Sequence, residues 1–487
     1  MSFGLSVIIY LPIFVINISL TFTIIFLERK NPQSTYAWLL FLWMFPIIGF
    51  LFYLFFSQNL TKRKIFRYNT PENIRYHHLL RQQHDLLSEI ISINPESPIE
   101  KYQHSIEFHL RVSQSLYTNN NDVEIFTDGH KKFEALFNAM ELATCSIHVE
   151  YYIIKNDSLA LRMIEILTRK ALEGVEVRLL FDAMGGRYLP HSIIEAFKSA
   201  GGQIGAFFPS LFKMLNLQIN YRDHRKIVVI DGNTGFVGGF NVGNEYLGLN
   251  SKMGYWRDTH LKITGSAAYE LQLRFLLDWR ASSCEELLID DEKLSAYFPQ
   301  IAPKSGVGIQ IVSSGPDKVN QQIKQGFLRM ITNAESYILI QSPYFVPDES
   351  ILEALKIALL SGIDVRIMIP NKPDHIFIYW ATLAYVGELI EYGAKVFIYE
   401  NGFLHAKTIV VDDAVCSVGS CNFDIRSFRL NFETNAFIYD RKVATQLKNI
   451  FVNDIKQCTY YDKELYHHRS RTIKIKESIS RLFSPLL

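Results

Sequence analysis

The sequence is poor in cysteine and has almost no net charge. Its 487 residues include five cysteines, Cys145, Cys284, Cys416, Cys421 and Cys458. An odd number without the paired spacing of metal ligands argues against a disulfide framework or a zinc site. We interpret the cysteines as reduced, structural thiols. The formal net charge of +1 argues against a dedicated nucleic-acid-binding protein, so we expect no nucleic-acid partner.

Charged residues are absent from two long stretches near the N-terminus, Phe3–Leu27 and Tyr36–Phe56. Each stretch is long enough to cross a hydrocarbon core, which takes about 20 helical residues. Charged residues 28–30 follow the first stretch where a cleaved signal peptide would have small residues. Residues 1–60 are therefore predicted to form a hairpin of two transmembrane helices.

The charges that flank this hairpin predict its orientation. Four basic residues follow the second stretch, Lys62, Arg63, Lys64 and Arg67, whereas the connecting turn offers two, Arg29 and Lys30. The side with more basic residues usually stays in the cytoplasm. We therefore expect a multi-pass membrane protein in which the chain after the hairpin lies on the cytoplasmic side. Residues 61–121 are interpreted as a polar connector.

The rest of the chain contains an internal repeat. Each copy has a β-rich run, a helical stretch and a second β-rich run, at 146–152 and 173–181 in the first copy and at 336–345 and 361–369 in the second. The helical stretches end at Gly174 and Gly362, as expected for left-handed C-caps. This βαβ pattern predicts an α/β fold of two pseudo-symmetric lobes, each a β-sheet flanked by helices, at residues 122–300 and 301–487.

Both copies carry the same chemical motif. It reads histidine, one residue, lysine, four mostly β-branched residues and aspartate, as His224, Lys226 and Asp231 and again as His405, Lys407 and Asp412. Side chains alternate between the faces of a strand, so the histidine and lysine of each copy point into one site. The aspartates end the strands, and for them we favour a role in organising the turn.

Further polar residues follow each motif. Asn241 and Asn422 stand at equal offsets from their histidines. A carboxylate on a later strand completes each set, and Asp258 aligns with Glu433. One such set alone is weak evidence, but two sets at equivalent points of a repeat predict a single shared active site.

These residue types suit the transfer of a phosphoryl-containing group. A neutral imidazole can attack phosphorus, and a second imidazole can protonate the leaving oxygen and later deprotonate the incoming hydroxyl. A carboxylate can fix the tautomer of each histidine, while lysines and asparagines hold the nonbridging oxygens. No metal and no other cofactor is needed. Since one lobe supplies half of the set, the lobes are expected to face each other about a pseudo-two-fold axis.

With its duplicated His-x-Lys-x4-Asp motif, the sequence resembles the phospholipase D superfamily from about residue 122 to the C-terminus. The resemblance implies a two-lobed α/β fold, one shared active site and a metal-independent transfer in two steps. In that superfamily the N-terminal histidine is often the nucleophile. Carried over, His224 attacks and His405 is the acid and base, although the repeat symmetry alone leaves this assignment open.

Finer features resemble bacterial cardiolipin synthases: the hairpin turn 28–32 and the segments 255–260, 342–347 and 481–487. Ser420 matches the small hydroxyl position of that family, whereas Gly239 replaces it in the first lobe. We expect the first lobe to depend there on backbone donors.

The reaction implied by the resemblance exchanges one phosphodiester for another. One phosphatidylglycerol gives a phosphatidyl-histidine and glycerol, and a second phosphatidylglycerol then attacks to give cardiolipin. The expected partners are therefore membrane phospholipid and the bilayer, with the oligomeric state left open. A hydrolytic phospholipase D is the nearest alternative, and a non-enzymatic membrane scaffold is the alternative from another class.

For three further features of the sequence, two interpretations are open. Residues 207–221 are either a packed loop or a lipid-facing lip of the site. Glu245 either supports the site or lies on a solvated surface. The C-terminal tail, in which basic and apolar residues alternate from Arg469 to Phe483, is either a solvated helix or a basic amphipathic segment that docks on anionic lipid.

Overall fold

The structure, a computed structural model, describes residues 2–28, 32–49, 53, 79, 82–83, 98–207, 221–283, 295–301, 306–482 and 484. Most of the expected connector, the basic residues that set the orientation of the hairpin, and residues 208–220 of the proposed lip lie outside this description.

The predicted repeat is confirmed as two βαβ units. In the first, β2 (Ser146–Tyr151) pairs in parallel with β3 (Glu176–Asp182) after α7 (Ser158–Leu172). In the second, β11 (Tyr337–Gln341) pairs in parallel with β13 (Asp364–Pro370) after α12 (Glu349–Leu360). The two connecting helices begin and end alike. An aspartate caps each N-terminus, Asp157 or Asp348, and Gly174 or Gly362 adopts a positive φ of 89° or 86° past the C-terminus.

Sixteen of the described strands form one mixed sheet, in the order β20-β14-β13-β11-β16-β17-β19-β10-β1-β9-β7-β6-β2-β3-β4, with β5 on β19. The other four form two-stranded pairs, β12 (Phe345–Val346) with β18 (Phe423–Asp424) and β8 (Trp256–Arg257) with β15 (Phe403–Leu404). The order is symmetric about its centre, where β1 (Tyr117–Phe126) pairs with β10 (Val307–Ser314). The remaining first-lobe strands are β4 (Gln203–Phe207), β6 (Lys226–Ile230), β7 (Thr234–Gly238) and β9 (His260–Thr264). Their counterparts are β14 (Lys395–Tyr399), β16 (Thr408–Val411), β17 (Val415–Gly419) and β19 (Asn431–Tyr439), and β20 (Cys458–Tyr461) adds an edge.

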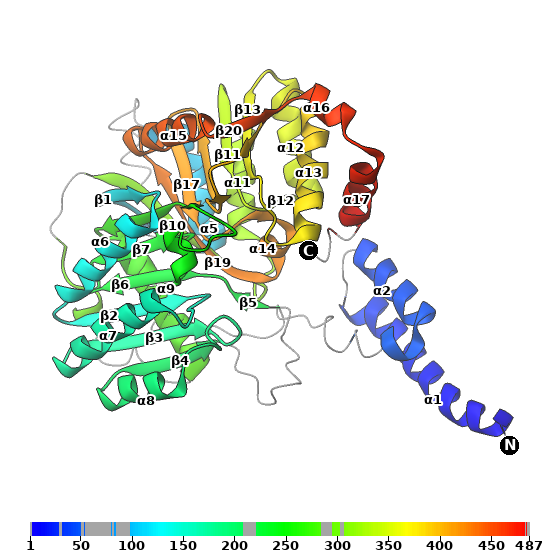
Figure 1. Cartoon of the computed structure of the whole chain (residues 1–487), viewed down its shortest axis with the longest axis horizontal. Helices are drawn as coiled ribbons and strands as arrows, with labels where there is room; N and C mark the ends of the chain where they lie inside the picture. The colour runs from blue at the N-terminus through cyan, green and yellow to red at the C-terminus, as the bar shows by residue number, and fades with distance from the viewer. Residues whose placement is uncertain are drawn as a thin grey trace.

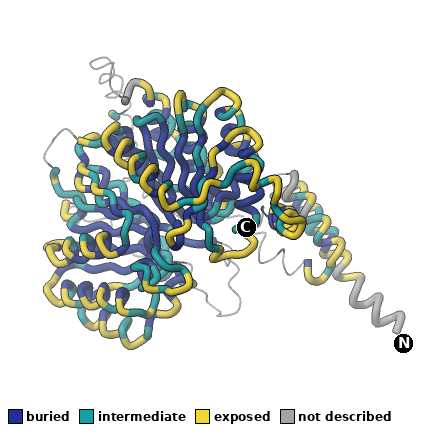
Figure 2. The backbone as a smooth tube through the Cα atoms, turned by 45° about the horizontal axis from the view of Figure 1, so that its top comes forward, coloured by how far each residue is buried: buried dark blue, intermediate teal, exposed yellow. Residues whose placement is uncertain are grey.

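Helices cover the sheet, whose strands are buried in the middle of the molecule (Figures 1 and 2). In the first lobe these are α6 (Gly129–Glu141), α8 (His191–Ser199) and α9 (Ala267–Ser283), with the 3₁₀ helix η3 (Asn244–Leu247). The second lobe has α11 (Gln322–Thr332), α13 (Ile376–Glu391), α14 (Ile425–Arg429), α15 (Arg441–Ile455), α16 (Lys463–His468) and α17 (Arg471–Leu482). Helix α5 (Pro98–Ser113) packs on β10 and α11.

The two lobes share part of their hydrophobic core. One buried cluster joins Ile227 and Val237 of the first motif hairpin to Val410 and Val418 of the second. Burial of a fully enclosed aliphatic side chain stabilises a fold by about 1.5–3 kcal/mol. Because this cluster takes side chains from both halves, it fixes the relative position of the two motifs.

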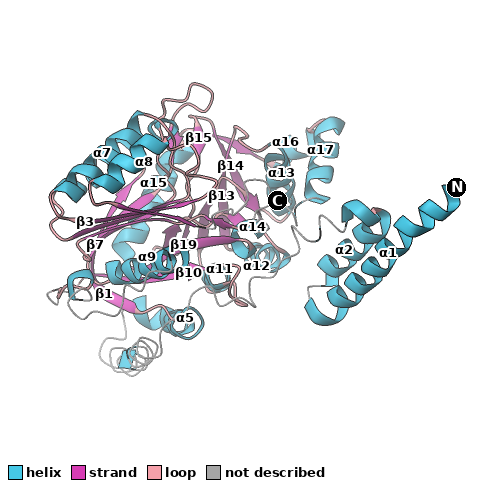
Figure 3. Ribbon diagram, turned by 90° about the horizontal axis from the view of Figure 1, so that it is seen from below, coloured by secondary structure: helices cyan, strands magenta, loops and turns pink. Residues whose placement is uncertain are grey.

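The N-terminal segment forms α1 (Ser2–Phe22), continued by the π-helix η1 (Thr23–Glu28), and α2 (Pro32–Met44). The helices contact each other through the Phe14 and Trp43 rings, whose centroids are 5.7 Å apart. The buried side chain of Asn17 in α1 also donates to the carbonyl of Leu42 in α2 and to that of Pro46, just after α2. The pair extends away from the sheet (Figure 3). Over the residues searched, none of the helices combines the length and apolar character required to cross a membrane.

Candidate active site

Two equivalent β-hairpins carry the motifs. β6 pairs with β7 and β16 pairs with β17, both antiparallel, and the β-branched residues between lysine and aspartate are fully buried in them. His224 and His405 lie just before β6 and β16, where the two lobes meet. The hairpins thus bury their apolar side chains in the sheet and present the histidines at its end.

Each histidine backbone is held by the opposite lobe. β5 (Arg222–Asp223) pairs with the start of β19, and the His224 N–H donates to the Phe432 carbonyl at 2.9 Å. In the same way β15 (Phe403–Leu404) pairs with β8 (Trp256–Arg257), and the His405 N–H donates to the Arg257 carbonyl at 2.7 Å.

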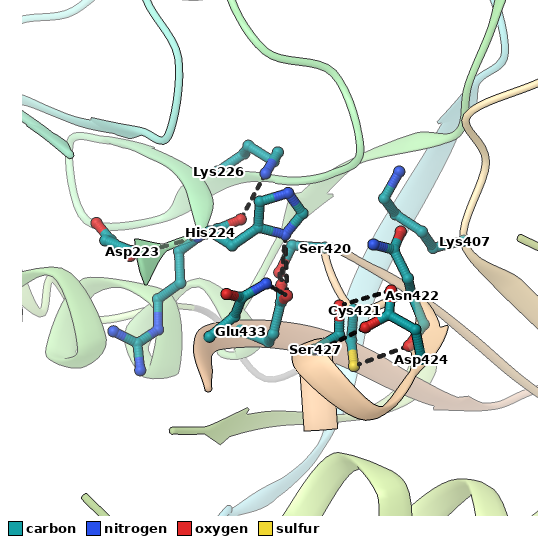
Figure 4. Close-up of polar contacts among 12 residues, drawn as sticks. Asp223, His224, Lys226, Lys407, Ser420, Cys421, Asn422, Asp424, Ser427 and Glu433 are labelled. Atoms are coloured by element: carbon teal, nitrogen blue, oxygen red, sulfur yellow. Dashed lines mark hydrogen bonds and ion pairs between the residues drawn. The ribbon is translucent and has the colours of Figure 1, made fainter. Parts of the chain in front are cut away.

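The carboxylates are exchanged between the lobes. Nδ1 of His224 lies 2.9 and 3.0 Å from the two carboxylate oxygens of Glu433, and Nδ1 of His405 lies 2.6 Å from Oδ2 of Asp258. The sequence grouped each carboxylate with the histidine of its own copy, which is wrong. The parallel pairing of β5 with β19 and of β8 with β15 brings each carboxylate to the other histidine. Figure 4 shows the pair of His224 and Glu433.

The two pairs differ in their electrostatics. Burial raises the pKa of Glu433 to about 7, against the effect of Lys226 and of hydrogen bonds from Ser420 and Asn431. Burial also opposes ionisation of Asp258, but Lys407, His405 and the Thr259 N–H together hold the pKa of Asp258 below its ordinary value. The carboxylate beside His405 is therefore the more strongly ionised of the two.

The pKa values of the histidines follow this difference. Burial, with added repulsion from Lys226 and Lys407, lowers the pKa of His224 well below its ordinary value. Burial and Lys407 also lower the pKa of His405, but Asp258 opposes that shift through charge and a hydrogen bond. His224 is thus held neutral, and His405 is the better placed to carry a proton.

The two lysines are buried beside the histidines. Each Nζ donates to the backbone carbonyl of the histidine two residues earlier, Lys226 to His224 and Lys407 to His405. Burial lowers the pKa of Lys226 to about 7 and that of Lys407 to about 8, while nearby carboxylates oppose the shift. An entering phosphate anion would favour the charged form of both lysines.

The two asparagines are not equivalent. The Asn241 carbonyl accepts from the Ile153 N–H at 3.3 Å and its amide donates to the Tyr246 hydroxyl at 3.1 Å, so it braces a loop. The Asn422 side chain bonds to Asp424, and its buried oxygen has no hydrogen-bond partner in the structure. In Figure 4 Asn422 lies beside Lys407, which leaves it as the asparagine of the pair at the reaction centre.

Ser420 and Gly239, at equivalent positions of the two copies, each contact one of the two carboxylates. The Ser420 hydroxyl donates to Glu433. In the first lobe, where the turn was expected to depend on backbone donors, the N–H of Gly239 donates to the Thr259 carbonyl at 2.9 Å. A Cβ at Gly239 would lie 2.0 Å from Oδ1 of Asp258, so the carboxylate of Asp258 occupies the space that a side chain would take.

The motif aspartates lie at the far ends of their strands, away from the histidines. Asp231 accepts from the backbone N–H groups of Thr144, Cys145 and Ser146 at 2.8–2.9 Å. Asp412 accepts from the equivalent groups of residues 335–337 at 2.8–2.9 Å. Both have a positive φ, 47° and 54°. The structure therefore gives them the turn-organising geometry that the sequence analysis favoured.

Two buried ion pairs behind the histidines were missed. In the first lobe Arg225 bonds to Asp278 of α9 at 2.8 Å. In the second lobe, Arg257 of the first lobe donates from Nε to the two carboxylate oxygens of Asp454 in α15, at 3.0 and 3.2 Å. Gln341 also donates to Asp454 at 2.9 Å.

A buried carboxyl pair adjoins the first of these ion pairs. Glu150 occupies the position in β2 that Gln341 occupies in β11, and it is buried next to Asp223. Burial raises the pKa of both carboxyl groups, that of Asp223 to about 7. Glu150 lies inside a predicted strand and Asp223 directly precedes the motif histidine His224. These two acidic residues were the signal in the sequence by which the carboxyl pair could have been found.

The arrangement can perform acid–base and nucleophilic chemistry at one phosphate. The side chains of His224 and His405 are 12% and 9% exposed, and the Tyr152 and Trp256 rings lie 5.0 and 5.2 Å from them. In the described part of the chain, histidine, cysteine and acidic side chains form no group of three or more that could hold a metal ion. Glu245 forms an ion pair with Lys155 at 3.7 Å, a contact on a partly exposed surface.

The sequence was compared with known families and proteins. Residues 136–279 and 327–455 match the family described as "Cardiolipin synthase, PLD-like domain", and residues 15–58 match "Phospholipase_D-nuclease N-terminal". The chain is 50% identical over 474 residues to a "Cardiolipin synthase" of Oceanobacillus iheyensis, covering 97% of this chain and 98% of that one. It is 48% identical over 475 residues to the "Major cardiolipin synthase ClsA" of Bacillus subtilis, with the same coverage.

Among solved structures, the phosphatidylserine synthase of Haemophilus influenzae superposes with a TM-score of 0.59, over 79% of this chain and 100% of that chain, at 13% identity. At that identity the likeness concerns the fold alone.

Proposed function

The chain belongs to the family of cardiolipin synthases with a phospholipase D-like domain, and we propose that it joins two phosphatidylglycerol molecules into cardiolipin and glycerol through a phosphohistidine. It is a phosphatidyltransferase. The observation that carries the mechanism is the exchange of carboxylates, which pairs His224 with Glu433 and His405 with Asp258. Each half of the repeat supplies a histidine and the carboxylate that orients the other histidine.

In the first step His224 attacks phosphorus with Nε2. The Nδ1–H of His224 donates a hydrogen bond to Glu433, which leaves the Nε2 lone pair free to attack. A P–N bond forms and the P–O bond to the glycerol headgroup breaks. His405 gives its proton to the departing alkoxide, so glycerol leaves and the phosphatidyl group stays on His224.

In the second step His405 is neutral and removes the proton from a headgroup hydroxyl of the second phosphatidylglycerol. That oxygen attacks phosphorus, the P–N bond breaks, and cardiolipin leaves with His224 again neutral. The number of phosphodiester bonds is unchanged, so no activated donor is required. Lys226, Lys407 and Asn422 hold the nonbridging oxygens in both steps.

The pKa directions support these roles for the histidines. A nucleophilic imidazole must be neutral, and the pKa of His224 is held well below its ordinary value by burial and by the two lysines. A general acid must carry a proton, and Asp258 supports a proton on His405. The charge of the entering phosphate strengthens that support.

The N-terminal helices are proposed to insert into the bacterial cell membrane as a hairpin, with the catalytic lobes on the cytoplasmic side. The uncharged stretches support this, as do the large apolar side chains that α1 and α2 expose, among them Leu11, Phe14, Leu40 and Met44. If so, the full chain stays with membranes after an alkaline carbonate wash. Release by that wash would contradict the insertion.

The reaction is tested by incubating the full chain in vesicles with phosphatidylglycerol labelled in the headgroup and in the acyl chains. We expect acyl label in cardiolipin and one released glycerol per cardiolipin. Phosphatidic acid as the main product would instead identify a hydrolase, with water in place of the second lipid.

The histidine roles are tested with a phosphatidyl ester whose leaving group needs no protonation, such as p-nitrophenol. His405→Ala should still release p-nitrophenol and accumulate acid-labile acyl label on the protein, whereas His224→Ala should do neither. Labelled protein from His224→Ala would reverse the assignment.

A further inference from the structure

The helix α17 near the C-terminus has its polar and apolar sides reversed relative to an ordinary surface helix. Glu477 and Ser480 are 3% and 2% exposed, whereas Ile475, Ile479 and Leu482 are 59%, 47% and 77% exposed. At about 100° per residue, the three apolar residues share one side and the two buried polar residues lie on the opposite side. A helix normally buries its apolar side.

Polar contacts fix this orientation. Arg469, just before α17, donates to Glu477 at 2.8 Å, and its guanidinium lies 3.5 Å from the centre of the Tyr466 ring. That ring in turn packs on Gly387 of α13, where a Cβ would be only 2.0 Å from it.

The far half of α17 is held on α13 as well. Arg481 pairs with Glu388 and stacks on Tyr385, and Lys476 lies 4.9 Å from the Trp380 ring centre. These contacts hold the polar side inward, so the helix cannot bury its apolar side by rotating without breaking them.

An exposed apolar side that is rigidly presented needs an apolar surface to cover it. Basic residues lie on both flanks of the apolar residues. Lys474 is on one flank, where its Nζ donates to the His467 carbonyl at 3.2 Å, and Lys476 is on the other, beside the Trp380 ring. Lysines at the flanks of an apolar stripe can extend toward lipid phosphates while their stems stay on the apolar surface. This combination fits an anionic bilayer surface better than a protein surface.

We propose that α17 is an interfacial membrane helix, with Ile475, Ile479 and Leu482 inserted among the headgroups and upper acyl chains of anionic lipid. The proposal rests on the proposed function, which makes anionic phosphatidylglycerol the substrate. Figures 1 and 3 show α17 on the side of the molecule from which α1 and α2 extend. A bilayer that holds the N-terminal hairpin is therefore within reach of α17.

The position of α17 also connects the membrane to the reaction centre. It packs along α13, which begins two residues after Asp374. The Asp374 carboxylate accepts from the Tyr344 hydroxyl and supports the charge of Lys407. Docking of α17 would thus set the distance between the bilayer and the phosphate-binding lysine, which determines how readily a headgroup reaches the histidines.

The test uses the full chain with a nitroxide on a single introduced cysteine, after replacement of Cys145, Cys284 and Cys458 by serine. One variant carries the label at Ile479→Cys, and a matched control carries it at Leu172→Cys, a 72% exposed position of the first lobe. Each is reconstituted into phosphatidylglycerol-rich vesicles or into vesicles of phosphatidylcholine alone. Power saturation then compares access of oxygen, which dissolves in lipid, with access of a water-soluble nickel chelate.

In phosphatidylglycerol vesicles we expect the label at 479 to favour oxygen and to be shielded from nickel, while the label at 172 stays open to nickel. In phosphatidylcholine the preference at 479 should weaken. Nickel access at 479 equal to that at 172 would overturn the proposal, as would shielding from both reagents, which means coverage by protein. Equal insertion into both lipids would overturn the selectivity for anionic lipid.

A second measurement asks whether the contact matters for turnover. The triple variant Ile475→Ser, Ile479→Ser, Leu482→Ser should lose about tenfold in activity on vesicles and keep its activity on short-chain phosphatidylglycerol in detergent. The triple variant Leu142→Ser, Leu172→Ser, Leu249→Ser, at exposed first-lobe positions, should change neither. Because the label reports insertion without turnover, a failure of the reaction and a failure of the docking are distinguishable.

Discussion

Nδ1 of His405 lies 2.6 Å from Oδ2 of Asp258, although the two residues belong to different copies of the repeat and are 147 positions apart. The equivalent pair, His224 and Glu433, is 209 positions apart. Neither lobe contains a histidine with its orienting carboxylate. Any change that shifts one lobe against the other therefore acts on both histidines at once.

Gly239 should tolerate no side chain. In Gly239→Ala the new methyl group would lie 2.0 Å from Oδ1 of Asp258, so the carboxylate must move away from His405. Misplacement of a catalytic group by about 1 Å can cost about 100-fold in rate. We expect kcat to fall by about that factor with little change in KM, as measured by steady-state kinetics.

The control for this prediction is Ser420→Ala at the equivalent position, which removes a hydrogen bond to Glu433 and the acceptor of the Thr434 N–H but introduces no atom that would displace Glu433. It should cost less in kcat than Gly239→Ala, because Glu433 keeps its contacts with His224 and Asn431. A Gly239→Ala enzyme with normal kcat would show that Asp258 does not need this space.

Asp454 should position the His405 side of the active site. Asp454→Asn leaves the guanidinium of Arg257, 2% exposed, without its charged partner. Loss of one partner of a buried pair costs about 3–5 kcal/mol. Arg257 directly precedes Asp258 in the chain, and its carbonyl accepts the His405 N–H. A shift of Arg257 would therefore displace both catalytic groups, and kcat should fall about tenfold with little change in KM. Thermal unfolding and steady-state kinetics measure the two effects.

Asp413→Asn is the matched control for Asp454→Asn. Asp413 pairs with Lys448 of the same helix α15, at 2.7 Å and with both side chains more than a third exposed. Such a pair contributes about 0–1 kcal/mol, so stability and kcat should stay near those of the unaltered enzyme. If Asp454→Asn lowers the unfolding temperature and leaves kcat unchanged, the ion pair has no positioning role.

Asp231 should matter for folding more than for turnover. Asp231→Ala removes the acceptor of three backbone N–H groups at the start of β2 and puts alanine at a φ of 47°. The Ser146 N–H lies at a buried residue and costs about 1–3 kcal/mol if left unpaired, whereas Thr144 and Cys145 are exposed, so their N–H groups can bond to water. We expect a lower unfolding temperature, with the activity per folded molecule within about threefold at low temperature. A folded Asp231→Ala protein with no activity would instead place Asp231 in the chemistry.

The value of kcat/KM should fall as the pH rises above about 7. The pKa of Lys226 is lowered to about 7 and that of Lys407 to about 8, mainly by burial. As pH rises through this range the free enzyme loses the positive charges that bind phosphate, so kcat/KM should fall between about pH 7 and 9. Bound phosphate favours the charged lysines, so the fall in kcat should lie at higher pH. A kcat/KM that stays constant up to pH 9 would mean that the lysines keep their charge without substrate.

The sequence by itself determined the repeated βαβ architecture and the residues of the site. A spacing of two residues keeps His224 beside Lys226 and His405 beside Lys407, and each lysine Nζ donates to the carbonyl of its own histidine. Glycine C-caps and β-branched runs likewise act within a few residues. These features depend on local backbone geometry, which a sequence specifies directly.

The tertiary structure alone decided which groups meet across the interface. Asp258 and Glu433 changed partners because β5 and β8 pair with strands of the opposite lobe. The carboxylate of Asp258 fills the space beside Gly239 that a side chain would take. The apolar side of α17 faces outward because Arg469 and α13 hold its polar side. Each outcome depends on a contact between segments far apart in the chain, and local periodicity contains no record of such contacts.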